Sequence, residues 1–460
     1  MIDELKPYPE YKDTGLPWLG QVPGHWQSAP GFAAFREKQV KNIGLKEKRV
    51  LSLSYGRIVV KPEGLRGLMP DSFETYQIVE PGDIIIRSTD LQNDKTSLRI
   101  GMVRDHGIIT SAYICMKITD AALPEFGYQL LNTYDLCKVL YGMGSGLRQN
   151  LVWTDFKRMP VFLPALEEQA AIVRFLDHAT HRMDKAIRAK SKTIALLNEQ
   201  KQAIIHRAVT RGLDPDVPLK DSGIPWLGQI PAHWEVRRAK YLFCEIDERS
   251  INGDEELLSV SHITGVTPRS EKNITMFKAE SYAGHKVCRP GDLVINTMWA
   301  WMAALGVSKH TGIISPAYAV YRPREPRRLT DEYVDFLLRT KPYISNYICR
   351  STGVRASRLR LYPEEFFRIS IIIPPIVEQE SIIIWLRTET REIVTATQRI
   401  EREIELLREY RTRLIADVVT GKLDVREAAA RLPEIESAPA DETELAEPEE
   451  SGEELAEENA

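Results

Sequence analysis

The sequence predicts an α+β protein in which two mixed α/β modules are separated by two long antiparallel coiled-coil helices, all related by a pseudo-twofold internal repeat. Three observations predict this architecture. One sixteen-residue motif occurs twice, further landmarks repeat at nearly constant spacing, and each copy ends in a long heptad-patterned segment without Pro or Gly. At 460 residues the chain is also too long for one ordinary hydrophobic core.

The repeated motif is the strongest of these signals. Residues 11–26 read YKDTGLPWLGQVPGHW and residues 219–234 read LKDSGIPWLGQIPAHW, identical at eleven of sixteen positions across an offset of 208. Chance does not produce such a match. The motif therefore marks the start of each module, and its tryptophans (Trp18, Trp26, Trp226 and Trp234) are interpreted as structural anchors. Exposed stacking platforms for bases are the weaker alternative.

Four further landmarks follow in the same order in both copies. Pro81-Gly82-Asp83 before three isoleucines corresponds to Pro290-Gly291-Asp292 before Leu-Val-Ile, which predicts a turn into a buried strand. The other pairs are 145–148 with 352–355, 164–169 with 374–379, and 208–214 with 418–424. Between the landmarks, residues 27–140 and 235–345 share little sequence. Two copies of one scaffold with different surfaces are predicted.

A long helix is predicted after each Pro-x-x-x-Glu-Gln landmark, as far as Arg211 and Thr420. Apolar residues recur there at alternating spacings of four and three, and the second copy keeps the register of the first at an offset of 210. The residues predicted to pair the helices are Met183, Ile187, Ile194, Leu197, Ile204, Ile393, Ile400, Ile404, Leu407 and Leu414. About 34 paired residues would span on the order of 50 Å. The alternative is two surface helices, each packed on its own module.

These elements divide the chain into five parts. We expect a first module at 1–165, a first spacer helix at 166–212, a second module at 213–375, a second spacer helix at 376–430 and an acidic disordered tail at 431–460. The tail is rich in Glu, Ala and Pro. From Pro433 onward it holds twelve Asp or Glu and no Lys or Arg, so a net charge of −4 leaves +8 on the remainder. A mildly basic folded part is compatible with a nucleic-acid ligand.

Composition excludes several other classes of protein. Hydrophobic content of 43% and charged content of 27% are typical of a globular protein, with no apolar run long enough for a membrane span and no export signal, so a cytoplasmic location is expected. Five scattered cysteines without a Cys-x-x-Cys pair indicate buried free thiols, with no disulfide framework and no zinc site.

No catalytic constellation is found in the sequence. Phosphate-loop, nucleophile-elbow and zinc-protease motifs are missing, and so is the Asn/Asp-Pro-Pro-Tyr/Phe tetrapeptide of adenine methyltransferases. The glycines at 141–146 lack the strand and helix of a nucleotide loop. Asp177, His178 and His181 have helical spacing but no second ligand cluster, which favours a solvated helix face. We therefore expect no catalytic residue, no metal and no directly bound cofactor.

Polar and basic residues on predicted loops of the variable regions are the candidate DNA contacts. Arg reads guanine and Asn or Gln reads adenine in the major groove, whereas Lys and Ser typically hold phosphate. Each single residue could equally belong to a solvated surface. The candidates are Lys46, Lys48, Arg49, Arg57, Arg87, Ser88, Thr89, Arg148, Gln149 and Asn150 in the first copy, and Arg269, Lys272, Asn296, Trp299, Trp301, Arg355, Ser357, Arg358 and Arg360 in the second.

The duplicated motif at 12–26 and 220–234, together with the Pro-x-x-x-Glu-Gln segments that lead into long helices, resembles the specificity subunits of type I restriction-modification enzymes. The resemblance covers residues 8–430. It implies two target recognition domains, each reading one half of a split double-stranded DNA site, with the helices as spacer. It also implies that two modification (methyltransferase) subunits dock on the helices, and that restriction subunits with translocase and nuclease activity join the complex. S-adenosylmethionine, ATP and Mg²⁺ would be bound by those partners, and the specificity subunit itself would catalyse nothing.

Two other functions remain open at this point. One is a stand-alone DNA-binding or assembly protein that derives from such a subunit and has lost its enzyme partners. The other is an enzyme in its own right, a nuclease or methyltransferase whose motifs are cryptic. Activity of the purified chain with S-adenosylmethionine or Mg²⁺ alone would favour the latter.

Overall fold

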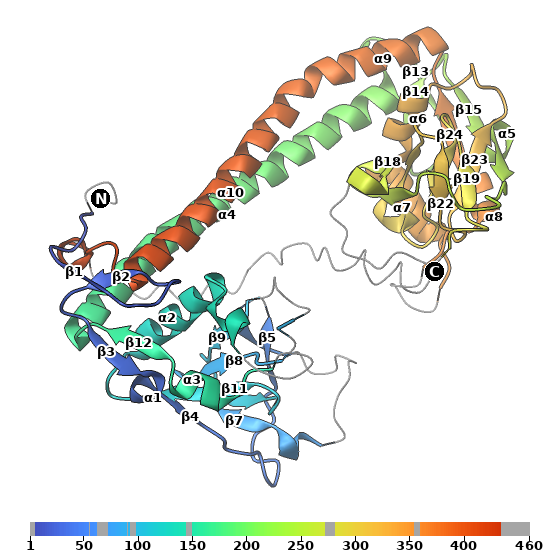
Figure 1. Ribbon diagram of the computed structural model, residues 1–460. Helices are drawn as coiled ribbons and strands as arrows, with labels where there is room; N and C mark the ends of the chain where they lie inside the picture. The colour runs from blue at the N-terminus through green and yellow to red at the C-terminus, as the bar shows by residue number, and fades with distance from the viewer. Residues whose placement is uncertain are drawn as a thin grey trace. The chain divides into compact units, whose positions relative to one another are not determined.

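The computed structural model describes residues 5–54, 56–61, 72–89, 91–92, 98–143, 150–271, 281–353 and 359–433. The chain divides into two compact units, residues 1–190 with 402–440 (unit 1) and residues 191–401 with 441–460 (unit 2). Unit 1 therefore combines residues from both halves of the sequence. Both long helical segments cross from one unit to the other (Figure 1).

Unit 1 is built around a four-stranded antiparallel sheet with strand order β4-β11-β8-β9. Two-stranded antiparallel ribbons surround this sheet. The central strands are β4 (Phe35–Glu37), β11 (Ile114–Ile118), β8 (Ile84–Ile86) and β9 (Ile100–Met102). The ribbons are β1 (Tyr11–Asp13) with β2 (Gln21–Pro23), β3 (Gln27–Pro30) with β12 (Pro160–Leu163), β5 (Leu51–Ser54) with β6 (Arg57–Val60), and β7 (Gln77–Val79) with β10 (Gly107–Ile109). Its shorter helices are α1 (Gly31–Ala34), α2 (Pro124–Leu136), α3 (Trp153–Lys157) and the 3-10 turns at Phe73–Thr75 and Val139–Gly142.

Unit 2 repeats this topology strand for strand. Its central sheet has the order β16-β23-β20-β21, formed by β16 (Phe243–Ile246), β23 (Ala319–Pro323), β20 (Leu293–Ile295) and β21 (Leu305–Val307). The ribbons are β13 (Leu219–Asp221) with β14 (Gln229–Pro231), β15 (Glu235–Arg238) with β24 (Ser370–Ile373), β17 (Leu258–Ser261) with β18 (Gly265–Pro268), and β19 (Lys286–Cys288) with β22 (Gly312–Ile314). Its shorter helices are α5 (Ala239–Leu242), α6 (Asp331–Leu338), α7 (Lys341–Arg350), α8 (Pro363–Phe367) and the 3-10 turns at Arg269–Glu271 and Ala300–Met302. The predicted internal repeat is confirmed.

The Pro-Gly-Asp turns show why both copies keep the same local sequence. Gly82 and Gly291 have φ of 91° and 88°, a backbone region that favours glycine. Asp83 closes its turn by accepting a hydrogen bond from the backbone N–H of Glu80 at 2.8 Å, and Asp292 does the same with Arg289 at 2.9 Å. The chain then enters β8 or β20, whose residues are fully buried. The predicted turn into a buried strand is confirmed in both units.

The long helices begin where the sequence predicts them. α4 spans Leu166–Arg211 without interruption. The second segment is a long bent helix, formed by α9 (Ile376–Glu389) and α10 (Arg391–Val419), which meet at Thr390. After Val419 the chain turns at Gly421, at φ 78°, and forms the short helix α11 (Arg426–Ala430).

Within each unit, parts of the two long helical segments pack together in one hydrophobic core. In unit 1, Met183 of α4 belongs to the same core as Leu414 and Val418 of α10. In unit 2, Ile205 and Val209 of α4 belong to the same core as Leu386 of α9. All ten residues predicted to pair the helices are buried or half-buried, and the segments run antiparallel in unit 1, because Asp184 meets Arg411 whereas Lys190 meets Glu403. The predicted architecture, two α/β modules with two long antiparallel helices, is confirmed.

Two expectations from composition have mixed outcomes. No helix in the described part of the chain is long and apolar enough to cross a membrane. All five cysteines are free thiols, but only Cys115 and Cys288 are buried. The prediction of buried thiols is wrong for Cys137 and Cys349, which are exposed because each lies at or near the end of a helix, at the C-cap of α2 and in the last turn of α7.

Candidate nucleic-acid interface

The repeated motif positions each module by a buried tryptophan. Trp26 and Trp234 are 1% and 0% exposed, so the prediction that they are structural anchors is confirmed. The indole N–H of Trp26 donates to Glu168 at 3.0 Å, and that of Trp234 donates to Glu378 at 3.0 Å. Sequence reasoning missed this role of the two glutamates. The signal was available, because each is the Glu of a Pro-x-x-x-Glu-Gln landmark.

The glutamine that follows each glutamate also fixes the start of its helix. Gln169 donates its amide to the carbonyls of Ala121 and Pro164, and it accepts from the N–H of Leu123. Gln379 bonds in the same way to Pro374, Arg328 and the N–H of Thr330. Both side chains are fully buried. Each glutamine therefore connects the first turn of its long helix to the Pro-x-x-x-Glu-Gln landmark and to the loop that precedes α2 or α6. These bonds fix the orientation of each module on its own helix.

Several candidate DNA contacts lie just after strand β8 in unit 1 and just after the equivalent strand β20 in unit 2. The N–H of Leu151 donates to the carbonyl of Ser88 at 2.8 Å, and the N–H of Leu361 donates to the carbonyl of Thr297 at 2.9 Å. In unit 1 this bond brings Arg87, Ser88 and Thr89 beside Asn150. In unit 2 the equivalent bond brings Asn296 beside Arg360, and Trp299 follows two residues after Thr297. Residues far apart in the sequence thus form one edge of each module.

The same edge is fixed by a buried hydroxyl in each unit. The side chain of Ser88 donates to the carbonyl of Ala112 at 2.9 Å, and that of Thr297 donates to the carbonyl of Ala317 at 2.9 Å. Ser88 is 5% exposed and Asn296 is 7% exposed, and the Asn296 side chain accepts from the N–H of Met298. These polar groups are engaged within the fold. They shape the edge, and the proposed DNA-facing groups are the neighbouring Arg87, Thr89, Asn150, Trp299 and Arg360.

Arg99 supports this edge in unit 1 and was missed by the sequence reasoning. It is fully buried, and its guanidinium donates to the carbonyls of Thr89 at 2.7 Å and Arg87 at 3.2 Å, and to the hydroxyl of Tyr141 at 3.1 Å. Ala304 accepts the backbone bond in unit 2 that Arg99 accepts in unit 1. Nothing in the sequence separates such an arginine from a solvated one. The two edges therefore have the same backbone hydrogen bond, but the residue that accepts it is Arg99 in unit 1 and Ala304 in unit 2.

A pair of tryptophans marks the edge of unit 2. The rings of Trp299 and Trp301 stack with centroids 5.9 Å apart and an angle of 20° between their planes. The indole N–H of Trp301 donates to the carbonyl of Met298 at 2.9 Å, which fixes that ring. Both residues are half-buried. Trp299 therefore lies at the edge with one neighbour already stacked on it.

The remaining candidates lie around the hairpins β5–β6 and β17–β18. Arg57 opens β6, next to the hairpin turn, whereas Arg269 follows β18 at the opposite end of its hairpin. The residue equivalent to Arg269 is Lys61, because both donate their N–H to the residue before the first strand of the hairpin. The two arginines therefore do not occupy equivalent places. Lys46, Lys48 and Arg49 are exposed on the loop before β5.

That loop carries one internal acidic partner. Glu47 accepts hydrogen bonds from the backbone N–H groups of Arg49 and Lys48, both at 2.8 Å, and these bonds lower the pKa of its carboxyl group. Arg49 lies 3.6 Å from Asp105. Lys46 and Lys48 extend from a loop that is held in shape by Glu47. Arg148, Gln149, Lys272, Arg355, Ser357 and Arg358 lie outside the described residues.

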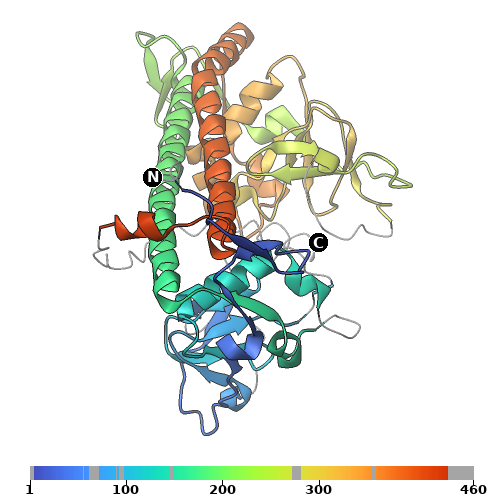
Figure 2. The same cartoon turned by 60° about the vertical axis from the view of Figure 1, so that its left-hand side comes forward.

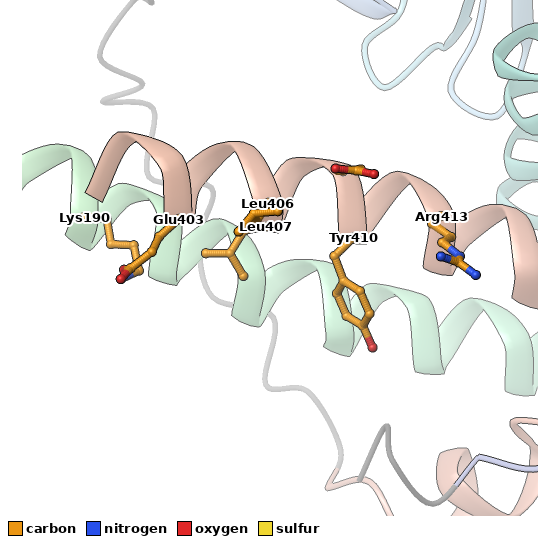
Figure 3. Close-up of a pocket in the computed structure, with 7 residues that line it drawn as sticks. Lys190, Glu403, Leu406, Leu407, Tyr410 and Arg413 are labelled. Carbon is orange, nitrogen blue, oxygen red and sulfur yellow. The ribbon is translucent and has the colours of Figure 1, made fainter. Parts of the chain in front are cut away.

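A second surface feature lies on the helices. A groove of about 570 Å³ in unit 1 is lined mainly by one stripe of α10, with Lys190 of α4 at one end (Figure 3). Leu406 and Tyr410 on this stripe are 49% and 41% exposed. At the equivalent position of α4, in unit 2, Leu196 is 57% exposed. Each unit thus presents an exposed leucine at the same point of its helix.

Comparison with solved structures finds several similar chains, and the first of these shares this architecture. A chain from a structure on complex assembly and conformational transition of the type I R-M system aligns with a TM-score of 0.57 and 16% identity, covering 87% of this chain and 99% of that one. The two share one fold. The HsdS subunit from Thermoanaerobacter tengcongensis aligns at 16% identity and a TM-score of 0.38, covering 87% and 98% of the two chains. The type I restriction-modification S subunit from M. genitalium aligns at 12% and 0.32, covering 86% and 96%. No protein-family model and no curated protein matches the sequence.

Proposed function

We propose that this chain is the DNA-specificity subunit of a type I restriction-modification enzyme, with one module for each half of a bipartite site. The observation that carries the proposal is the identical topology of two modules whose loop edges differ in sequence. A repeated scaffold places two equivalent edges, and different side chains on them allow two different half-sites. The fold shared with a type I R-M component supports the same function.

The proposed reading edges have the chemistry that base recognition needs. Arg87 and Thr89 flank the residue that is bonded to the neighbour of Asn150 in unit 1, and in unit 2 the segment that contains Trp299 is bonded to the neighbour of Arg360. Arginine and asparagine can make paired hydrogen bonds to guanine and adenine in the major groove. Lys46 and Lys48, exposed on their loop, suit phosphate contacts that set position without reading sequence. The buried hydroxyls and Arg99 behind the edges hold the loop backbones in place before DNA arrives.

The helices are proposed to serve both as spacer and as docking surface. Leu406 and Leu196 occupy equivalent positions, one in each unit, and in unit 1 Leu406 adjoins the exposed Tyr410, so that the two form a contiguous apolar surface of the kind that protein partners cover. The groove beside Leu406 extends that surface in unit 1. Two equivalent surfaces suit two modification subunits. S-adenosylmethionine, ATP and Mg²⁺ are then bound by partner subunits, and this chain contributes recognition without catalysis.

The experiment combines this chain with type I modification subunits from the same organism and measures methylation of a random DNA library. The proposal expects adenine methylation at a split motif, and none when this chain is omitted. Leu406→Glu should weaken assembly, whereas Ile251→Glu, at an isoleucine that is 89% exposed on a loop, should not. Sequence-specific DNA binding by the chain without modification subunits would favour a stand-alone DNA-binding protein, and methylation or cleavage by the chain alone would show an enzyme.

A further inference from the structure

One face of the long helical segment is covered in unit 1 and bare in unit 2. In unit 1 this face comprises Glu168, Ala171, Arg174, Phe175 and His178 of α4, which are all buried or half-buried. The equivalent residues of α9, at an offset of 210, are Glu378, Ser381, Ile384, Trp385 and Thr388. Only Glu378 is half-buried, and the other four are exposed.

The cover in unit 1 is the segment that contains α11. Val425, Ala429 and Leu432 are buried in the same hydrophobic core as Phe175, and Arg174 donates a hydrogen bond to the carbonyl of Leu432. At the other end of the face, Arg426 lies 5.2 Å from the ring centre of Tyr8, whose hydroxyl donates to Glu168 at 2.8 Å. α11 lies beside the first turns of α4 in both views (Figures 1 and 2).

The bare face in unit 2 is the more apolar of the two. Ile384 replaces Arg174 and is 64% exposed, and Trp385 is 37% exposed where Phe175 is 1% exposed. Val377, which borders this face, replaces Glu167, a residue that is exposed in unit 1 as well, and is 69% exposed. Chain that leaves α4 at Gly212 continues directly into the second motif at 219–234, so nothing comparable to α11 follows it. We name Val377, Ile384 and Trp385 the α9 patch.

The polar groups on this face do not need water. Ser381 donates its hydroxyl to the carbonyl of Val377 at 2.8 Å, and Thr388 donates to the carbonyl of Ile384 at 3.0 Å. Hydroxyls that bond back to their own helix can be covered without loss of a hydrogen bond. Between the apolar side chains, the face therefore offers carbon atoms and satisfied hydroxyls. Such a surface suits an apolar partner.

We propose that the α9 patch binds a short amphipathic helix of one modification subunit, at the place that α11 fills in unit 1. The required pattern follows from the segment 425–432 around α11, which buries Val425, Ala429 and Leu432, at i, i+4 and i+7. Because unit 1 already has its own cover, only one of two modification subunits can make this contact. The two modification subunits therefore bind to this chain through different contacts. This inference rests on the proposed function for the identity of the partner, and it adds the asymmetry.

The test transfers the residues of unit 1 onto α9. The double variant Val377→Glu/Ile384→Arg copies Glu167 and Arg174 to exposed positions, where the helix should fold unchanged, and Ile251→Arg is the matched exposed control. Calorimetric titration of the full chain with modification subunit should resolve two binding events. We expect the double variant to weaken one of them by about tenfold, or about 1.4 kcal/mol, and to leave the other unchanged. Backbone hydrogen exchange of residues 376–388 should become slower when modification subunit is added to the wild-type chain, and should not change when it is added to the double variant.

Each other outcome overturns the inference and identifies the reason. Two unchanged binding events in the double variant would leave docking intact and reject the α9 patch. No binding by the wild-type chain would reject the proposed docking as a whole. A wild-type dimer that the double variant turns into a monomer would make a second copy the occupant. Faster exchange at 376–388 after deletion of 434–460, without any partner, would make the acidic tail the occupant.

Discussion

Arg411 of α10 donates to the carboxylate of Asp184 of α4 at 2.5 Å, and this pair sets the antiparallel register of the helices in unit 1. Both side chains are about one-third exposed, at 33% and 36%. Ion pairs at that exposure stabilise a fold by about 0.2 to 1 kcal/mol. The pair therefore specifies alignment, and the apolar residues on either side of it supply most of the stability.

Leu414 should contribute far more stability than Leu406, although both lie on α10. Leu414 is 3% exposed in the core of unit 1, and Leu406 is 49% exposed. Leu414→Ala should lower the free energy of unfolding of unit 1 by about 2 to 5 kcal/mol, because it leaves a cavity. Leu406→Ala should change it by less than about 0.5 kcal/mol. Hydrogen exchange of core amides in unit 1 measures both values, and equal effects would contradict the packing described for α10.

The stability of unit 2 should fall as the pH drops below about 6.5, in part because of His206. Burial, and then the positive charge of Arg211, lowers the pKa of this imidazole in the folded chain. As the pH falls, the imidazole is protonated in the unfolded chain at a higher pH than in the folded chain. The contribution of His206 to the free energy of unfolding is therefore complete above the unfolded pKa and is lost as the pH falls through the lower, folded pKa. His206→Ala, which copies Ala416 of the other repeat, should reduce the loss between pH 7.5 and 5.5. An identical pH slope in the variant would reject this role.

Arg360 should contribute to the reading of one half-site only. Arg360→Ala in the assembled enzyme should relax specificity in the half-site of unit 2, at a cost of about 1 to 3 kcal/mol, and leave the other half-sequence unchanged. Arg431, exposed after α11, provides the matched control. Methylation of a randomised site library measures the preference at each base. A uniform loss across all sequences would instead make Arg360 a phosphate contact.

Shortening both helices should change only the gap between the half-sites. Residues 189–195 and 399–405 are equivalent in the repeat, and the register of Asp184 with Arg411 places them opposite one another. Removing one heptad from each shortens the spacer by about 10 Å, which corresponds to about three base pairs. The preferred gap should shrink by that amount while both half-sequences persist. An unchanged gap would show that the helices do not set the spacing.

The repeat itself made most of the fold predictable. An identical turn at Gly82 and Gly291, and the anchors Trp26 and Trp234, could be inferred because each occurs twice in the sequence. Features that occur once could not. The buried guanidinium of Arg99 donates to three specific acceptors, and neither the neighbouring residues nor a periodic pattern in the sequence indicates that Arg99 is buried. Burial of Ser88 was missed for a similar reason, since the carbonyl of Ala112 that accepts its hydrogen bond is brought near only by the folded strands.

The bare face of α9 shows a second limit of sequence reasoning. Periodicity places Ile384 and Trp385 on a helix, but it does not reveal that the equivalent face of α4 is covered by residues near 425–432. That difference depends on how the chain beyond Val419 folds within unit 1, where Asp424 pairs with Lys6. It becomes visible only when the two units are compared residue by residue.

Mapping methylated adenine across the source genome, before and after disruption of this gene, tests the central claim most directly. If each module reads its own half-site, one split motif, two short sequences separated by a fixed gap, should lose methylation at every occurrence in the disrupted strain. Exchange of residues 235–345 for another sequence of the same fold should then restore methylation at a motif altered in one half. A methylome that does not change on disruption, or a lost motif that is continuous and undivided, would contradict the account.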